Sequence, residues 1–123
     1  MKSPLIAAIL LISLSGGGVA ASEPSKDGAW QGEGFSSDSE CPAFDFWVSV
    51  EGERVEGNAR QTGTDYKVLG KLTDDGVFTG KVTYMFFEIA SLNGRVGATQ
   101  GSGEWVALKG PDCEGSFAVR KLQ

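Results

Sequence analysis

Glycine-rich turns at regular spacing are the feature of this sequence that most constrains its fold. A short unit, in which a turn is followed by an apolar residue and then a glycine, recurs as "DGAWQG", "GERVEG" and "DGVFTG", and more loosely as "GSGEWV". Gly57, Gly80 and Gly103 are each 23 residues apart, about the length of two short strands with their turns. Short strands separated by such turns are typical of an all-β sandwich or barrel.

The first residues have the pattern of an export signal. A positive start at Lys2 precedes the apolar run "PLIAAILLISL", and small residues then lead to a cleavage site after Ala21. The run is about half the roughly 20 residues that a transmembrane helix needs, so an uncleaved anchor is the weaker alternative. We therefore expect a signal peptide over residues 1–21, a single domain over residues 22–123 and a secreted or periplasmic location. No membrane span is expected in the mature form.

The charge of the chain limits its partners. The sequence has 11 Lys and Arg against 16 Asp and Glu, a net charge of −5, and loss of Lys2 with the leader makes it one unit more negative. An acidic chain without a basic cluster is a poor match for nucleic acid or for an anionic membrane surface. We therefore expect neither as a partner.

The two cysteines predict one disulfide. Cys41 and Cys113 lie in a chain that carries an export signal, and exported proteins form disulfides. The bond would close a loop of about 70 residues and contribute very roughly 4 kcal/mol in the loop-entropy model. Metal ligation and redox chemistry are the alternatives, but the sequence has no C-x-x-C motif and no histidine.

Alternating apolar residues predict about eight strands. The Asn93-Gly94 dipeptide is a strong hairpin signal, so we expect a turn there, before a sixth strand that begins near Arg95. The other expected strands cover residues 29–35, 43–51, 54–62, 65–73, 77–87, 104–109 and 113–121.

The cysteines fix how these strands close. Cys41 follows the first expected strand and Cys113 begins the last. In a closed meander these two points share an end only if the strand count is even. The fold class predicted is therefore all-β: a small antiparallel up-and-down meander closed into an approximately eight-stranded barrel with one disulfide. The two-residue period predicts that Phe44, Phe46, Val48, Val50 and Phe117 face inward. Large inward residues paired with glycines suit a small barrel and favour a filled interior.

The segment "TYMFFEIA" (83–90) breaks the alternation, because four large apolar residues follow one another. Three interpretations are open. Residues 86–92 cross the open end of the barrel or fold back as a plug that buries these side chains, the apolar residues form an oligomer or partner interface, or they line a ligand pocket at the barrel mouth. The candidate ligand-binding residues are Tyr66, Tyr84, Phe86 and Trp105. The candidate interface residues are Trp47, Leu69, Met85 and Phe87.

The segment from Phe46 to Thr73 resembles the avidin and lipocalin group of secreted, calycin-type β-barrels. The resemblance consists of an early Gly28-Ala29-Trp30 start, an apolar strand, a "V-x-G" strand and "Y-x-x-x-G" from Tyr66 to Gly70, and it extends loosely to "GSGEWVALKG". It implies a small apolar or amphipathic ligand held in the barrel mouth. The tryptophans, hydroxyls and amides that bind biotin in avidin-type sites are not matched here, so biotin is not predicted.

Catalytic motifs are missing from the sequence. There is no histidine, no G-x-S-x-G elbow and no phosphate-binding loop. Asp45 and Glu104 are expected to face outward, and Asp74-Asp75 or the segment 36–41 could bind calcium, although "DDG" is first of all a turn. No catalytic residue, metal or cofactor is predicted.

The function predicted from these features is an exported, non-enzymatic β-barrel that binds a small apolar ligand or a protein partner. The first alternative is a structural or envelope interaction module with a filled core that could form a homodimer. A carboxylate-dependent hydrolase is a remote alternative.

Overall fold

The computed structural model describes residues 25–122, and every regular element in this range is a β-strand. The expected signal peptide and its cleavage site after Ala21 lie outside the described residues. The eight strands are β2 (Gly28–Phe35), β3 (Phe44–Glu51), β4 (Arg54–Gln61), β5 (Thr64–Leu72), β6 (Val77–Tyr84), β7 (Phe87–Val96), β8 (Gln100–Ala107) and β9 (Glu114–Lys121).

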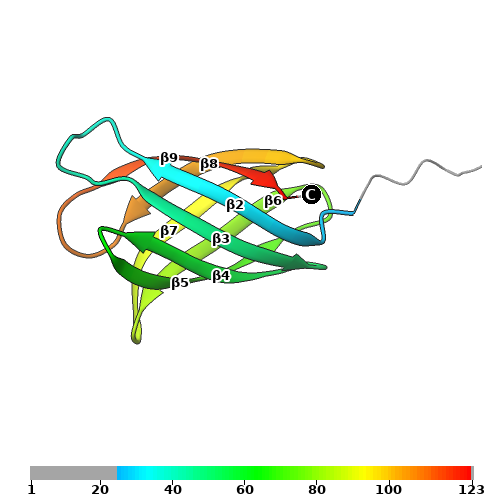
Figure 1. Cartoon of the computed structure of the whole chain (residues 1–123), viewed down its shortest axis with the longest axis horizontal. Coiled ribbons are helices and arrows are strands. Elements are labelled where there is room, and N and C mark those ends of the chain that lie inside the picture. Colours follow the sequence, from blue (N-terminus) through cyan, green and yellow to red (C-terminus); the bar gives the residue numbers. More distant parts are fainter. Residues whose placement is uncertain (1–24, 123) are drawn as a thin grey trace, which may run out of the picture.

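The strands form one closed antiparallel barrel (Figure 1). Each strand pairs with the next along the chain, and β2 pairs with β9 to close the sheet. Cys41, in the loop after β2, is bonded to Cys113, just before β9. The predicted fold class, the even strand count and the disulfide at the seam between the first and last strands are therefore confirmed.

The barrel has two different ends. The disulfide end carries the loops 36–43 and 108–113, which the Cys41–Cys113 bond joins, and the hairpin turns Thr62–Gly63 and Met85–Phe86. In Figure 1 it lies at the left. The opposite end carries the turns between β3 and β4, β5 and β6, and β7 and β8. The disulfide end thus has the longest loops, which makes it the more elaborate of the two.

Inward side chains alternate with outward ones along each strand, as a pleated strand requires. On β3, Phe46, Val48 and Val50 are buried, whereas Asp45 and Trp47 are exposed. The interior is apolar throughout, because no polar or charged side chain among the described residues is buried. The buried core consists of Trp30, Cys41, Phe46, Val48, Val50, Val55, Ala59, Val68, Leu72, Phe78, Val82, Leu92, Trp105 and Phe117.

Glycines make room for the aromatic rings of this core. A methyl group at Gly103 would lie 2.6 Å from Cζ of Phe117, and one at Gly70 would lie 2.6 Å from Cε1 of Phe78. Both distances are well inside van der Waals contact. The predicted pairing of large inward residues with glycines is therefore observed, and its physical reason is the space that each ring needs.

One strand boundary was predicted wrongly. Asn93 and Gly94 do not form a turn; they lie inside β7, where they pair with Glu104 and Gly103 of β8. The turn lies eight residues earlier, at Met85–Phe86, between the paired residues Tyr84 and Phe87. The dipeptide signal was misleading because Gly94 is needed for another purpose: a methyl group there would lie 3.0 Å from Cζ of Phe117.

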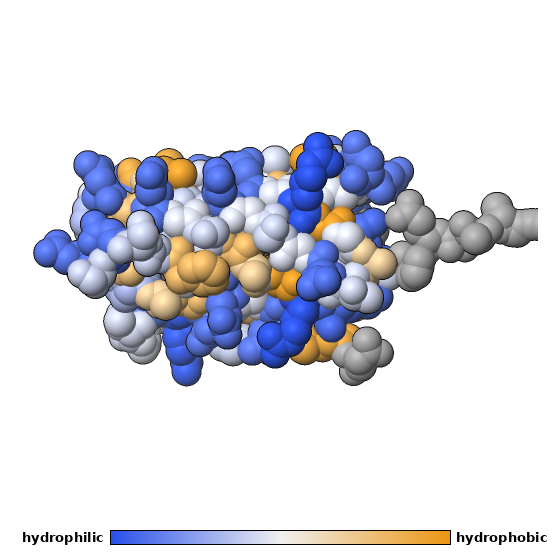
Figure 2. Space-filling view, turned by 90° about the horizontal axis from the view of Figure 1, so that it is seen from above, coloured by the Kyte–Doolittle hydropathy of each residue, from blue (hydrophilic) through white to orange (hydrophobic). Residues whose placement is uncertain are grey.

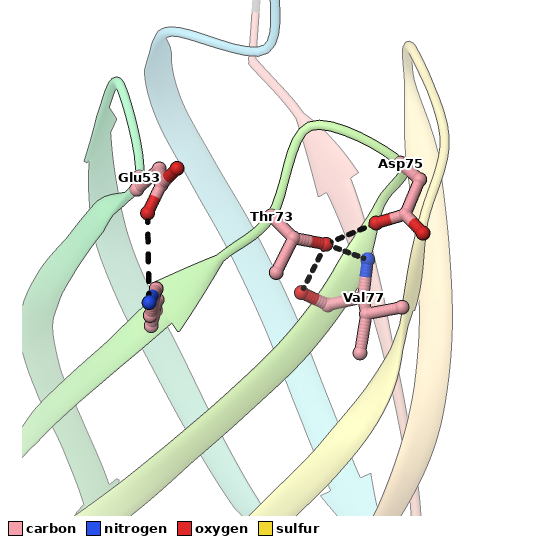
Figure 3. Close-up of polar contacts among 5 residues, drawn as sticks. Glu53, Thr73, Asp75 and Val77 are labelled. Atoms are coloured by element: carbon pink, nitrogen blue, oxygen red, sulfur yellow. Dashed lines mark hydrogen bonds and ion pairs between the residues drawn. The ribbon is translucent and has the colours of Figure 1, made fainter.

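The turn between β5 and β6, at the opposite end, is held by a side-chain network (Figure 3). The Thr73 hydroxyl donates to the Asp75 carboxylate and accepts a 3.0 Å hydrogen bond from the Val77 amide. Close by, the Lys71 ammonium lies 3.7 Å from the Glu53 carboxylate. The Asp74-Asp75 pair is therefore part of a hairpin turn, as expected.

The outer wall carries hydrophilic side chains together with exposed apolar ones such as Trp47, Leu69 and Val106. Figure 2 shows the side of the barrel that is uppermost in Figure 1, where a strip of apolar atoms runs between hydrophilic side chains. In the part of the chain that the structure describes, no helix is long and apolar enough to cross a bilayer.

Candidate functional site

A cavity of about 330 Å³ opens at the disulfide end of the barrel. It lies between the two disulfide-linked loops and the ends of the strands below them. Its lining consists of Glu40, Pro42, Phe44, Ala59, Gln61, Tyr66, Val82, Tyr84, Ile89, Ala90, Trp105, Ala107, Lys109, Pro111 and Cys113. The rest of the interior, toward the opposite end, retains only about 30 Å³ between its side chains. The expected filled interior is therefore found in one part of the barrel only.

Small residues create the cavity. The lining includes Ala59 on β4, Ala90 on β7 and Ala107 on β8, whereas in the filled part Leu72 and Phe78 occupy inward positions. Ala90 and Ala107 face each other across neighbouring strands. A methyl group leaves most of the space at an inward position empty, so three alanines near one end leave a hollow there.

A β-bulge shapes the wall on the side of β7. Val82 pairs with Ala90 but Thr83 pairs with Glu88, so Ile89 is an extra residue on β7. As a result Ile89 and Ala90, although adjacent in the chain, both line the cavity. A bulge increases local twist and bends the strand, and the hairpin beyond it projects from the lower left of the barrel (Figure 1).

Two pairs of packed aromatic side chains form part of the cavity lining. The Trp105 ring packs edge-on against Phe44 at 5.3 Å between centroids, and its Nε1 donates a 3.3 Å hydrogen bond to the carbonyl of Phe35. Tyr66 and Tyr84 pack at 5.5 Å between centroids. Because the indole N–H already has a partner, Trp105 presents its apolar ring surface to the cavity.

The rim of the cavity is polar. Gln61 donates through Nε2 to the carbonyl of Pro42 at 2.8 Å, which attaches the β4–β5 hairpin to the disulfide loop. The Lys109 ammonium lies 5.1 Å from the centre of the Phe87 ring, a distance suited to a cation–π contact. Glu40 is the one carboxylate and Lys109 the one ammonium in the lining. The cavity can therefore take an apolar body deep inside and a polar group at its opening.

Three of the four predicted ligand-binding residues line the cavity: Tyr66, Tyr84 and Trp105. Phe86 does not, and its side chain is 99% exposed. It was expected to follow Tyr84 on the inner face of one continuous strand, but the chain turns at Met85 and Phe86 instead. The idea that segment 86–92 folds back as a plug is also wrong, because Phe86 is exposed and residues 87–96 form β7.

The same turn changes the expected direction of Phe87. It was expected to face outward beside Met85, but it pairs directly with Tyr84 across the hairpin. Directly paired residues share a face of the sheet, so Phe87 lies on the same face as Tyr84. Its ring meets Lys109, which belongs to the cavity lining.

The predicted interface residues do not form one continuous patch. All four are exposed: Trp47, Leu69, Met85 and Phe87. Leu69 lies between Glu56 and Lys81 in the register of the sheet, so charged side chains flank it on both sides. Trp47 lies on β3, two strands away from Leu69. The largest apolar exposure is instead concentrated at the Met85–Phe86 turn.

Several lining residues were missed from the sequence, among them Phe44, Ile89, Ala90 and Lys109. Phe44 was recognised as inward-facing but not as part of a site. Ile89 and Ala90 were missed because the bulge breaks the two-residue period. One usable signal was present: a proline adjoins or nearly adjoins each cysteine, at Pro42 and Pro111, and both prolines line the cavity.

A second hollow, of about 670 Å³, lies on the outer wall of strands β2–β5. Its lining is mainly polar and includes Glu51, Arg54, Glu56 and Lys67. Arg54 and Glu56 are already paired at 2.5 Å. A shallow, charged surface suits solvent better than an apolar ligand, so the cavity at the disulfide end is the candidate site.

No family model, curated protein or solved structure matches this chain. The resemblance to calycin-type barrels therefore stays a prediction from the sequence.

Proposed function

We propose that this protein is an exported, non-enzymatic β-barrel that binds a small, largely apolar ligand in the cavity at the disulfide end. The observation that carries the proposal is the cavity itself: about 330 Å³, with an apolar and aromatic lining and a polar rim. Ligand sites in proteins are concave, mostly apolar and about 300–1,000 Å³ in volume. The volume lies at the lower limit of that range, which favours a ligand of up to about three rings or a short chain.

The chemistry of the lining favours binding over catalysis. Hydrolysis of a glycoside by paired carboxylates needs two acidic groups about 5–10 Å apart. Glu40 is the one acidic residue in the lining, and Asp45 and Glu104 are exposed on the outer wall. The disulfide that joins the two rim loops fits a protein that works in an oxidising compartment.

A titration with a neutral naphthylamine dye, N-phenyl-1-naphthylamine, tests the proposal. We expect the disulfide-bonded protein to bind the dye with 1:1 stoichiometry and to enhance its fluorescence. Native mass spectrometry of gently purified protein provides a second test, because a copurified small molecule would appear as a fixed mass increment.

A matched pair of variants locates the binding site. Ala107→Trp places an indole in the cavity and should weaken dye binding at least tenfold. Ala118→Trp makes the same change at an exposed position on β9 and should leave binding unchanged. The proposal fails if the wild-type protein does not bind the dye, or if both variants bind it as the wild type does.

A further inference from the structure

The turn between β6 and β7 is the most exposed apolar feature of the described chain. Met85 is 76% and Phe86 99% exposed, and these two residues are called the apolar tip below. Phe87 and Tyr84, directly below the tip, are also exposed. The hairpin projects from the lower left of the barrel in Figure 1, away from the two disulfide-linked loops at the same end.

Two large apolar side chains at an exposed turn are unfavourable in water. The other two-residue turn at this end, Thr62–Gly63, contains a polar residue and a glycine, and both have positive φ, as such turns favour. Met85 also has a positive φ, +57°, although it is not a glycine. A left-handed conformation costs a side-chain-bearing residue roughly 1–2 kcal/mol. Thr62 also has a positive φ, so the backbone conformation does not distinguish the two turns. The difference lies in the side chains, because the tip leaves two large apolar groups in water, and exposed apolar groups that lie together often mark a site of association.

The shape of the tip favours a lipid surface over a protein. A large side chain offers about 150–250 Å², so Met85 and Phe86 together offer roughly 400 Å², about half of what one partner contributes to a standard protein interface. The first charged residue along β6 below the tip is Lys81, which pairs with Glu88 at 2.9 Å. A convex apolar point with charged surroundings needs no complementary pocket if it enters a bilayer interface.

The charge of the chain selects the kind of lipid. The sequence carries a net charge of −5. Of the three lysines near the hairpin, Lys67 is the cross-strand partner of Thr83, and Lys81 is already paired with Glu88. Lys109 lies over the Phe87 ring. Anionic headgroups would therefore gain little and would be repelled by the rest of the protein, so a zwitterionic surface is the better match.

We propose that the apolar tip inserts into the interface of a zwitterionic lipid bilayer and holds the disulfide end of the barrel against it. Tyr84 lies at the base of the tip and also lines the cavity, so the cavity opening would lie close to the lipid. Docking itself depends only on the tip. The further consequence, that the ligand enters from the lipid phase, rests on the proposed function.

Flotation with phosphatidylcholine vesicles tests the docking. The full disulfide-bonded protein should float with the vesicles, and Met85→Ser/Phe86→Ser should reduce its partitioning at least tenfold, because two large side chains lose their apolar contact. The matched control, Trp47→Ser/Leu69→Ser, removes two exposed apolar residues from the barrel wall and should change partitioning less than twofold. Equal losses in both variants would overturn the proposal.

Three further measurements give the test independent readouts. Phe86→Trp should show a blue-shifted emission and quenching by brominated phosphatidylcholine when vesicles are added; an unshifted spectrum counts against insertion. Vesicles with 30% phosphatidylglycerol should bind no more tightly, and stronger binding to them would overturn the zwitterionic assignment. Light scattering that shows a dimer which dissociates in the Met85→Ser/Phe86→Ser variant would identify the tip as a protein interface and also overturn the proposal.

The dye titration separates this inference from the proposed function. A protein that binds the dye in solution but ignores vesicles refutes the lipid docking alone. A protein that floats with vesicles but does not bind the dye refutes the cavity function alone. Because Phe86 does not line the cavity, Met85→Ser/Phe86→Ser should bind the dye as tightly as the wild type.

Discussion

The two parts of the barrel interior follow the same strand pattern, but one is tightly packed and the other is open. In the filled part, Phe117 packs against Phe46 and Phe78 at centroid distances of 5.9 and 6.2 Å, and about 30 Å³ is left empty. At the disulfide end, alanines occupy several inward positions and about 330 Å³ is open. The packed length of the barrel therefore supplies most of the core, and the open length is where we propose that the ligand binds, so changes in each part should have different consequences.

The largest difference is expected from deleting an aromatic ring. Phe117→Ala should lower the free energy of unfolding by about 3–5 kcal/mol, because it leaves a cavity among tightly packed rings. Tyr66→Ala, in the partly exposed lining of the open end, should cost only about 1–2 kcal/mol, since less area returns to water. Urea denaturation of both variants measures the two losses. Equal losses would show that the two parts are packed alike.

The disulfide should have the next largest effect, and it should act mainly at the open end. Cys41→Ser/Cys113→Ser should lower the free energy of unfolding by about 2–4 kcal/mol, since the bond closes a loop over a sequence separation of 72. It should also speed hydrogen exchange in the loops 36–43 and 108–113 more than in β5 and β6. A melting temperature equal to that of the wild type would contradict the stabilising role, and uniform exchange would contradict its local action.

The filled part of the barrel could be predicted from the sequence because it depends on simple alternation. Phe46, Val48, Val50 and Phe117 were assigned to the interior from the two-residue period. The even strand count followed from the positions of the two cysteines. These features are local in sequence, or are fixed by one long-range bond, so no knowledge of side-chain packing was needed.

The open end could be predicted only in part. Tyr66, Tyr84 and Trp105 were identified from alternation, but Phe86 was misplaced because the turn was expected at Asn93-Gly94. The actual turn at Met85 has none of the residues that favour a positive φ, and the bulge at Ile89 shifts the period by one. Whether alanines leave a cavity or neighbours fill it depends on packing among five or more strands, which a linear pattern does not report.

The smallest expected effect is the pH dependence of stability. It compares the contributions of two turns at opposite ends of the barrel. The Thr73 hydroxyl lowers the pKa of Asp75 at the filled end, and the Arg60 guanidinium lowers that of Asp65 at the disulfide end by a hydrogen bond of 2.8 Å. A carboxyl group whose pKa is lowered on folding stabilises the protein above its unfolded pKa of about 4. This stabilisation is lost as the pH falls through the lowered value. We therefore expect the destabilisation caused by Asp75→Asn or Asp65→Asn to shrink between pH 6 and pH 2.

A high salt concentration should distinguish the contributions that the two turns make to stability. The Arg60–Asp65 pair is an exposed ion pair, so its contribution should fall in 1 M NaCl, where charges are screened over about 3 Å. The partner of Asp75 is a neutral hydroxyl, so its contribution should change little. Urea denaturation of the two variants at each pH and salt concentration measures both effects, with Asp74→Asn as the control for a neighbouring charge in the same turn. A difference from the wild type that stays constant with pH would show that neither carboxylate is linked to folding, and equal salt effects would show that both turns depend on charge alone.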